Sequence, residues 1–155
     1  MAGLLAVDLG LKAGFALFGR DGRLRWYRSK HYSSPSQFKR GMFAMLREVP
    51  EMAHLVLEGG GPLADIWIKE ADRRRLPVLQ LAAEEWREVF LWTRERRSGR
   101  QAKQNAREAA RRVAAWSGLP GPTSMNHNAA EAVMAGFLGL LRLGWLESIP
   151  LALRR

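Results

Sequence analysis

The sequence predicts a single α/β domain in which a mixed β-sheet carries helices on its faces. Three observations lead to this prediction. The 155 residues are enough for one hydrophobic core. Strand-like apolar segments come first in hairpin order and later alternate with helical patterns. No repeat, low-complexity tract or linker divides the chain. We therefore expect one domain over residues 1–155, with its core at about 3–146 and a C-terminal tail at 147–155.

The chain begins with three predicted strands joined by short turns. Leu4–Asp8 is a continuous apolar run that ends in an acid, which is typical of a strand buried on both faces. Gly14–Phe18 follows after a short turn. Asp21 and Gly22 then predict a hairpin into Leu24–Arg28, a segment with period-two alternation. These segments form the antiparallel half of the predicted sheet.

Two later segments complete the sheet, and helices connect and follow them. His54–Glu58 is again apolar and again ends in an acid, and Pro77–Leu81 is a short apolar run. The predicted helices run from Ser34 and Pro35 to about Arg47, and over Leu63–Arg74, Ala83–Trp92, Arg100–Ser117 and Ala129–Leu143. Hairpins followed by helical crossovers predict both antiparallel and parallel neighbours in one sheet.

Composition excludes several classes of protein. Hydrophobic residues make up 47% of the chain and charged residues 26%, which excludes an intrinsically disordered chain. The absence of Cys excludes a disulfide framework and a thiolate zinc site. No apolar run reaches the roughly 20 residues that a membrane span requires, and the first residues lack the basic region of a signal peptide. We therefore expect a cytoplasmic protein without a membrane partner.

The formal net charge of +10 has two open explanations. The 25 basic residues comprise 20 Arg and 5 Lys. This excess of Arg is compatible with a GC-rich or thermophilic source organism, whose proteins use Arg often whatever their function. It is equally compatible with a polyanionic partner, because the planar guanidinium group suits phosphate oxygens. Charge alone does not decide between the two.

Three acids fall at positions where a buried carboxylate needs a partner. Asp8 and Glu58 each end a predicted buried strand, and Glu131 lies in an otherwise apolar helical segment. Caps and turns are the alternative role for the first two. Carboxylate oxygens favour Mg²⁺ or Mn²⁺, and several of them beside a basic surface suggest a two-metal site for phosphodiester hydrolysis.

Polar residues surround the start of the last predicted helix. His127 and Asn128 precede Glu131 by four and three residues, so each can share one helix face with it. The alternative is that Asn126 or Asn128 is only the N-cap of this helix. That alternative leaves Glu131 itself unexplained.

A basic stripe is predicted on the helix that begins near Arg100. Eight of the basic residues fall between Arg94 and Arg112, against only two acids, and Lys103, Arg107 and Arg111 recur every four residues. Such a stripe is either a solvated face or a set of phosphate contacts. The scarcity of Glu partners on it favours phosphate contacts.

Four stretches of the chain together form a pattern that is more specific than each one alone. They are Leu5–Gly10 with Gly14–Phe18, Leu55–Gly60, Trp86 followed by Gly99–Lys103, and His127–Ala135. In this order they resemble RuvC-type Holliday junction resolvases of the RNase H-like (retroviral integrase) superfamily, in particular the short phage and organellar type. The resemblance implies an RNase H-like mixed five-stranded sheet flanked by helices. It also implies structure-selective, symmetric cleavage of four-way DNA junctions by a homodimer.

The resemblance also implies the residues of the site. It implies catalytic and metal-ligating roles for Asp8, Glu58, His127 and Glu131, with two Mg²⁺ ions for which Mn²⁺ can substitute and no small-molecule cofactor. The predicted contacts to branched DNA are Lys12, Arg96, Arg97, Arg100, Lys103, Arg107 and Arg111. The predicted self-contact of the homodimer is the helix with Leu63, Ile66 and Trp67.

The chain departs from the family pattern at two places that matter for the site. The acid expected just before Glu131 is absent, so His127, or with less support Asn128, is the candidate for the fourth ligand or a proton-transfer group. The aromatic residue expected soon after Glu58, which in relatives opens the junction centre, is also absent. Trp67 is the nearest candidate, and its alternative role is burial in the dimer interface.

Other functions remain compatible with these residues. One is an RNase H-like nuclease that acts on an RNA–DNA hybrid or a ribosomal RNA precursor. Another is a non-catalytic module that binds branched DNA, because the change at His127 and Asn128 is compatible with an inactive site. An actin-like kinase, which the Asp8-Leu9-Gly10 loop resembles, is excluded because that fold needs two lobes and a much longer chain.

Overall fold

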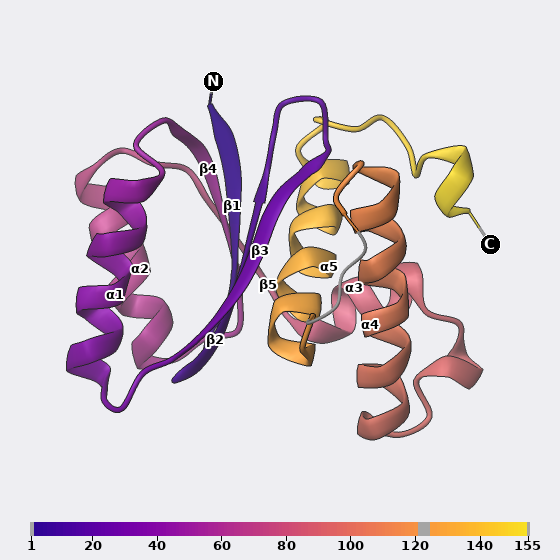
Figure 1. The fold of residues 1–155 in the computed structure, drawn as a ribbon. Helices are drawn as coiled ribbons and strands as arrows, with labels where there is room; N and C mark the ends of the chain where they lie inside the picture. Colours follow the sequence, from indigo (N-terminus) through magenta and orange to yellow (C-terminus); the bar gives the residue numbers. More distant parts are fainter. Residues whose placement is uncertain (1, 121–124, 155) are drawn as a thin grey trace.

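The five predicted strands form one mixed sheet in the order β3-β2-β1-β4-β5 (Figure 1). This computed structural model describes residues 2–120 and 125–154. The strands are β1 (Gly3–Asp8), β2 (Lys12–Phe18), β3 (Leu24–His31), β4 (Met52–Glu58) and β5 (Val78–Leu81). β1 pairs antiparallel with β2 and parallel with β4, so the hairpin half and the crossover half of the sheet meet at β1. The predicted fold class is confirmed, and the arrangement is consistent with an RNase H-like fold.

All five predicted helices are present; their ends differ from the predicted ones by one residue at most, except at the end of α3 and the start of α5. They are α1 (Pro35–Glu48), α2 (Pro62–Arg73), α3 (Ala83–Phe90), α4 (Gly99–Trp116) and α5 (His127–Arg142). α3 ends at Phe90 rather than at Trp92, because the backbone becomes extended at Leu91 and a short 3₁₀ turn follows at Thr93–Glu95. α5 begins two residues earlier than predicted. The side chain of Asn126 caps it by accepting a hydrogen bond from the backbone N–H of Ala129 at 2.9 Å.

The sheet separates two hydrophobic layers (Figure 1). Because side chains alternate along a strand, Leu5 and Val7 of β1 face α1 and α2, whereas Leu4 and Ala6 face the layer of α3, α4 and α5. β4 follows the same rule, since Leu55 and Leu57 lie in the first layer. These alternating runs are buried on both faces, as their continuous apolar sequences predict.

Helix α5 lies closest to the sheet because its inner side is built from small residues. A Cβ atom placed on Gly136 would lie 2.5 Å from a ring carbon of Phe18 and 2.9 Å from the side chain of Ala6. No larger residue fits there without displacing the helix. Most of α5 is buried, so this is a core helix rather than a surface helix.

The described residues, 2–120 and 125–154, contain no helix that is both long and apolar enough to cross a membrane.

Candidate metal centre and nucleic-acid interface

Strand register places Asp8 and Glu58 side by side. The two residues are direct partners in the parallel pairing of β1 with β4, and each is the last residue of its strand. Asp8 shares a face with Leu4 and Ala6, and Glu58 shares a face with Val56, by the alternation of each strand. Both carboxylates therefore lie on the face of the sheet that α5 covers.

The first turns of α5 bring Glu131 to the same place. β2 contacts this end of the helix so closely that a Cβ on Gly14 would lie 1.9 Å from the backbone oxygen of Asn128. Gly14 is in turn the antiparallel partner of Asp8. The absence of a side chain at Gly14 therefore lets the N-terminal end of α5 rest against β2. Glu131, one turn further along the helix, then reaches the end of β1.

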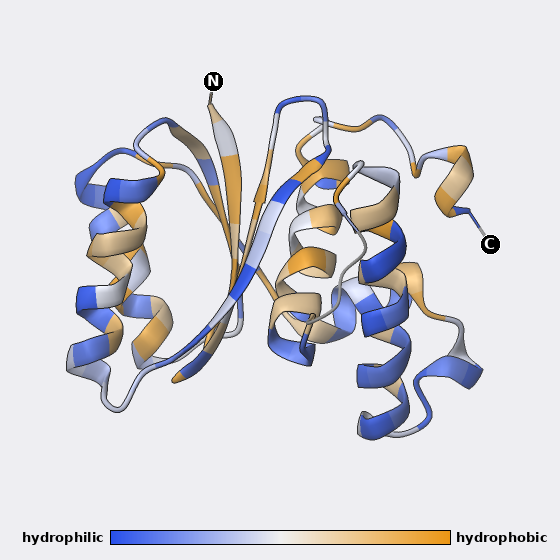
Figure 2. Ribbon diagram, viewed as in Figure 1, coloured by the Kyte–Doolittle hydropathy of each residue, from blue (hydrophilic) through white to orange (hydrophobic). Residues whose placement is uncertain are grey.

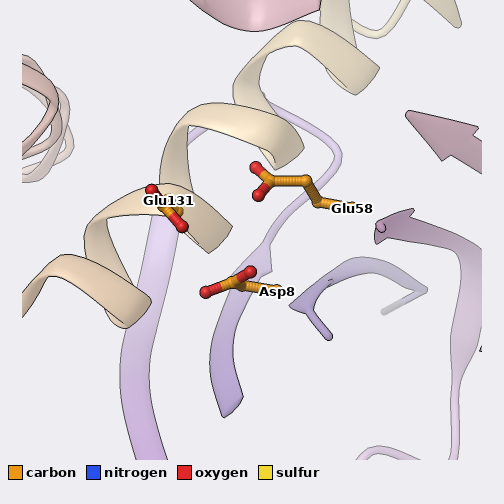
Figure 3. Close-up of side chains that lie close together, drawn as sticks. All are labelled: Asp8, Glu58 and Glu131. Carbon is orange, nitrogen blue, oxygen red and sulfur yellow. The ribbon is translucent and has the colours of Figure 1, made fainter. Parts of the chain in front are cut away.

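The three carboxylates converge on one point (Figure 3). One side-chain oxygen from each of Asp8, Glu58 and Glu131 lies within 4.8 Å of the other two. The residues are 8%, 6% and 8% exposed, respectively. They come from β1, β4 and α5, so the structure unites three acids that are separated by 50 and 73 positions in the sequence (58 − 8 and 131 − 58).

Burial and repulsion by neighbouring carboxylates make the carboxyl groups of Asp8 and Glu58 reluctant to ionise. Burial raises the pKa of Asp8 to about 9, and the charges of Glu58 and Glu131 act in the same direction. Burial and the charge of Glu131 raise the pKa of Glu58 to about 7, although its hydrogen bond from Trp86 and the positive charge of Arg87 oppose the shift. The cluster is thus short of positive charge.

Two neighbouring residues of α3 contact the cluster. The indole N–H of Trp86, a fully buried residue, donates a hydrogen bond to Oε2 of Glu58. Arg87 lies next to it, and its Nη2 is 3.3 Å from Oε1 of Glu131. The Arg87 guanidinium also lies 5.3 Å from the centre of the Trp86 ring. α3 therefore orients one carboxylate and partly neutralises another.

The donor set fits a divalent cation. Hard carboxylate oxygens are the ligands that Mg²⁺ and Mn²⁺ prefer, and three of them share one point within the described residues. A cation at that point would also counteract the burial and the repulsion that raise the pKa of Asp8 and Glu58. Asp8, Glu58 and Glu131 are thus the residues that would hold the metal.

The predicted fourth ligand, His127, does not belong to this group. Its ring nitrogens are not among the atoms within 4.8 Å of one another at the cluster. His127 is the first residue of α5, one full turn before Glu131, and it is half-buried. Asn128, the other candidate, lines a pocket of about 300 Å³.

Lys12, a predicted DNA contact, lines that same pocket. The other residues around it are Ser29, Lys30, His31 and Asn126, together with Asn128. The pocket adjoins the close contact between Gly14 and α5 that positions Glu131. Two lysines, Lys12 and Lys30, thus line this pocket.

The predicted basic stripe follows the outer side of α4 (Figure 2). The buried positions of this helix are Ala102, Ala106, Ala110, Val113 and Ala114, which leaves Lys103 and Arg111 exposed and Arg107 half-buried. Arg97 and Arg100 are also exposed, and Arg96 is half-buried with its Nε 3.4 Å from the backbone oxygen of Leu91. Among the described residues, no ion pair neutralises Arg97, Arg100, Lys103, Arg107 or Arg111.

Both roles considered for Trp67 are wrong. Trp67 is 1% exposed and packs in the layer between the sheet and the α1–α2 pair, with its ring 6.5 Å from that of Phe15. It is part of the core of its own chain, so its ring is available neither to DNA nor to a second copy. Amphipathic spacing on α2 directs Trp67 inward, together with Ala64 and Ala71.

Sequence reasoning missed Arg87 as a site residue. Trp86 was noticed only as part of a resemblance, and Arg87 is one of 20 Arg in a basic chain. The available signal was its position directly after that Trp, on a short helix of eight residues that follows β5.

No protein-family model matches this chain, and no curated protein matches it significantly.

Proposed function

We propose that this chain is a metal-dependent endonuclease that cuts branched DNA, with the four-way junction as its preferred substrate. The observation that carries the proposal is the convergence of Asp8, Glu58 and Glu131 at the end of two parallel strands. Divalent cations supply positive charge and activate water in phosphodiester hydrolysis by carboxylate sites of this kind. The resemblance to RuvC-type resolvases supports the choice of substrate.

We assign the residues of the site to metal binding, orientation of a carboxylate, proton transfer and phosphate binding. Asp8, Glu58 and Glu131 would hold Mg²⁺ or Mn²⁺, and Trp86 keeps the Glu58 carboxylate in one orientation by its hydrogen bond. His127, one turn before Glu131, remains our candidate for moving a proton beside the cluster. Lys12 and the exposed basic stripe on α4 would bind backbone phosphates of the substrate.

Symmetric cleavage of a junction requires two such sites, and we propose a homodimer. A groove of about 620 Å³ between α1 and α2 is lined by Met42, Phe43 and Ile66 together with charged residues, on the face away from α4. We keep Leu63 and Ile66 as the proposed self-contact and remove Trp67, because its ring is buried in the core of its own chain. Sedimentation equilibrium at micromolar concentration, with and without junction DNA, tests this assignment, and a monomer in both cases contradicts it.

The decisive experiment compares three labelled substrates: a four-way junction, a linear duplex and an RNA–DNA hybrid. Each is incubated with Mg²⁺, Mn²⁺ or EDTA, and Asp8→Asn is the inactive control. We expect paired nicks in the junction alone, dependent on metal and abolished by the substitution. Equal cutting of all three substrates would refute junction selectivity, and cutting of the hybrid alone would assign an RNase H-like activity. Tight binding without cutting would identify a non-catalytic binding module.

Binding of DNA by the stripe on α4 is tested through its salt dependence. The Lys103→Ala/Arg107→Ala variant removes two phosphate contacts, so the slope of log K against log salt should fall by about 1.8 for duplex arms. Fluorescence anisotropy with an uncleaved junction in Ca²⁺ or EDTA measures this slope. An unchanged affinity together with an unchanged slope would remove these residues from the interface.

A further inference from the structure

Arg87 is held beside the acidic cluster by an incomplete set of contacts. Its ion pair between Nη2 and Oε1 of Glu131 spans 3.3 Å, whereas charged hydrogen bonds of this type are usually about 2.7–2.9 Å long. Its Nε–H is buried and finds no hydrogen-bond partner among residues 2–120 and 125–154. A guanidinium prefers two parallel bonds to a carboxylate, and an orphaned buried donor is unfavourable by about 1–3 kcal/mol. The side chain is therefore weakly held in this position.

The position of Arg87 nevertheless has an electrostatic reason. Three carboxylates share one buried point, and within the described part of the chain Arg87 is the basic residue that forms an ion pair with one of them. Its guanidinium stacks near Trp86, which itself donates to Glu58. The positive charge of Arg87 thus acts on the oxygens of Glu58 and Glu131 that a divalent cation would also use.

We propose that Arg87 is the built-in counter-ion of the metal-free cluster, and that it sets the affinity for divalent cations by competing with them for Glu131. This inference rests on the metal-binding part of the proposed function, and not on the nuclease reaction. Arg87 is accordingly a positioning residue: it holds the Glu131 carboxylate in place until a cation takes up the same oxygen. Release of Glu131 frees the guanidinium, including its orphaned Nε–H, for another oxygen acceptor.

Competition has a signature that a merely structural role lacks. Removal of the Arg87 charge leaves the metal-free carboxylates less compensated, so the metal-free fold should lose stability. The same removal takes away a positive charge that opposes a cation, so the affinity for a divalent cation should rise. A residue that only supported the local structure would lower both quantities.

The test uses Arg87→Gln, Arg87→Lys and the control Arg142→Gln. Arg142 of α5 also pairs with a glutamate of α3, Glu85, at 2.6 Å, but it lies outside the cluster and is more exposed. Calorimetric titration with Mn²⁺ measures the cation Kd, and Glu58→Gln identifies the heat that comes from the cluster. Thermal unfolding in EDTA measures the stability of the metal-free protein.

We expect Arg87→Gln to lower the Kd for Mn²⁺ by roughly threefold to tenfold and to lower the Tm in EDTA. Arg142→Gln should leave the Kd within about twofold of the original value, as expected for a screened charge outside the cluster. Arg87→Lys keeps the positive charge but loses the planar guanidinium with its several N–H donors, so its Kd for Mn²⁺ should be intermediate. If Arg87→Gln does not fold, Arg87→Lys is the variant that tests the proposal. Weaker or unchanged Mn²⁺ binding in the variant that folds overturns the proposal.

The outcomes separate this proposal from the nuclease assignment. Mn²⁺ binding that tightens in Arg87→Gln, without cleavage of any substrate, supports the role of Arg87 and refutes the nuclease. Absence of Mn²⁺ binding in both the original protein and Arg87→Gln overturns the role of Arg87 together with the metal centre. Cleavage of junctions combined with weakened Mn²⁺ binding in Arg87→Gln overturns the role of Arg87 alone.

Discussion

The protein buries carboxylates at two places and treats them in opposite ways. On α2, Glu70 is 7% exposed and accepts hydrogen bonds from Nε and Nη2 of Arg73 and from Nε of Arg74, at 3.0, 2.6 and 2.6 Å. These bonds lower the pKa of Glu70 to about 2. In the cluster of Asp8, Glu58 and Glu131, burial and repulsion raise the pKa of Asp8 to about 9 and that of Glu58 to about 7.

The difference shows what separates a structural acid from a candidate functional one. The negative charge of Glu70 is compensated by two nearby arginines, Arg73 and Arg74, which lie three and four residues further along the chain. The cluster gathers three acids from distant parts of the chain around a single long contact to Arg87. Charge compensation inside the chain stabilises the fold, whereas a shortage of compensation creates affinity for an external cation.

The largest expected effect comes from Asp8→Asn. Loss of this ligand should reduce metal-dependent cleavage by roughly a thousandfold or more, because the charge of the site depends on all three acids. The same variant should raise the stability of the metal-free protein at pH 8, because Asp8 with its raised pKa takes up a proton on folding at that pH and the amide of Asn does not. Single-turnover cleavage and thermal unfolding in EDTA measure the two effects.

Glu70→Gln is the matched control for Asp8→Asn. It also replaces a buried carboxylate by an amide, but at the compensated site. Cleavage should remain within about twofold of the original rate, which is the range expected for a position away from the reacting groups. A thousandfold loss of cleavage in Glu70→Gln, or retained activity in Asp8→Asn, would contradict the distinction between the two places.

A smaller effect is expected from Trp86→Phe. The substitution keeps an aromatic ring in the core and removes the N–H that orients Glu58. Loss of such an outer partner typically reduces metal affinity or activity by about 10–100-fold. Mn²⁺ titration and cleavage rates measure this effect. Near-wild-type Mn²⁺ affinity in a folded Trp86→Phe protein would show that the hydrogen bond does not position the carboxylate.

The two places should also respond to pH in opposite senses. Asp8 keeps its proton in the metal-free fold up to about pH 9, whereas the unfolded group loses it near 3.8, so its contribution to stability falls as pH rises between about 4 and 9. Glu58 adds a similar fall between about 4.5 and 7. Glu70, with its lowered pKa, instead loses its stabilising contribution as pH falls from about 4.5 to 2.

Denaturant unfolding in EDTA across pH 2–10 resolves these contributions by difference between variants. Asp8→Asn should remove part of the decline at high pH, and Glu70→Gln should remove part of the decline at low pH. Saturating Mg²⁺ should also reduce the decline at high pH, because it compensates the ionised cluster. A decline at high pH that neither Mg²⁺ nor Asp8→Asn changes would contradict the raised pKa of Asp8.

The smallest effect is the stability change of Glu70→Gln at neutral pH. Its partners Arg73 and Arg74 are largely or partly exposed, so solvent weakens both ion pairs. We expect a loss of about 1 kcal/mol in the free energy of unfolding, with no change in the Kd for Mn²⁺. Urea denaturation at pH 7 measures the stability, and a change in Mn²⁺ affinity would indicate that the two places are coupled.

Most of the fold could be predicted from the sequence because its signals are local. The apolar run that ends at Asp8, the one that ends at Glu58, and the Pro at the start of α1 are properties of neighbouring residues. The ends of elements were less predictable. The side chain of Asn126 caps α5, so the helix begins at His127 rather than at the predicted Ala129.

The candidate site could be predicted only in part. The positions of Asp8 and Glu58 at strand ends indicated that both would lie at one edge of the sheet, and they are direct partners. The interior position of Trp67 depends on how α2 rotates against the sheet, which a single segment does not reveal. The position of Arg87 directly after Trp86 was the local signal that distinguished it from the other arginines.

The sequence by itself determined the order of the strands and helices, the excess of Arg, and three acids in positions where a buried charge needs a partner. Those features follow from the period of apolar residues along the chain and from the chemistry of single side chains. Only the tertiary structure decided that Gly14 lets α5 rest against β2, that Glu131 thereby joins Asp8 and Glu58, and that Trp86 and Arg87 contact them. The reason is physical: the distance between residues far apart in the sequence is set by how closely helix and sheet surfaces pack, and that depends on all of the contacting side chains together.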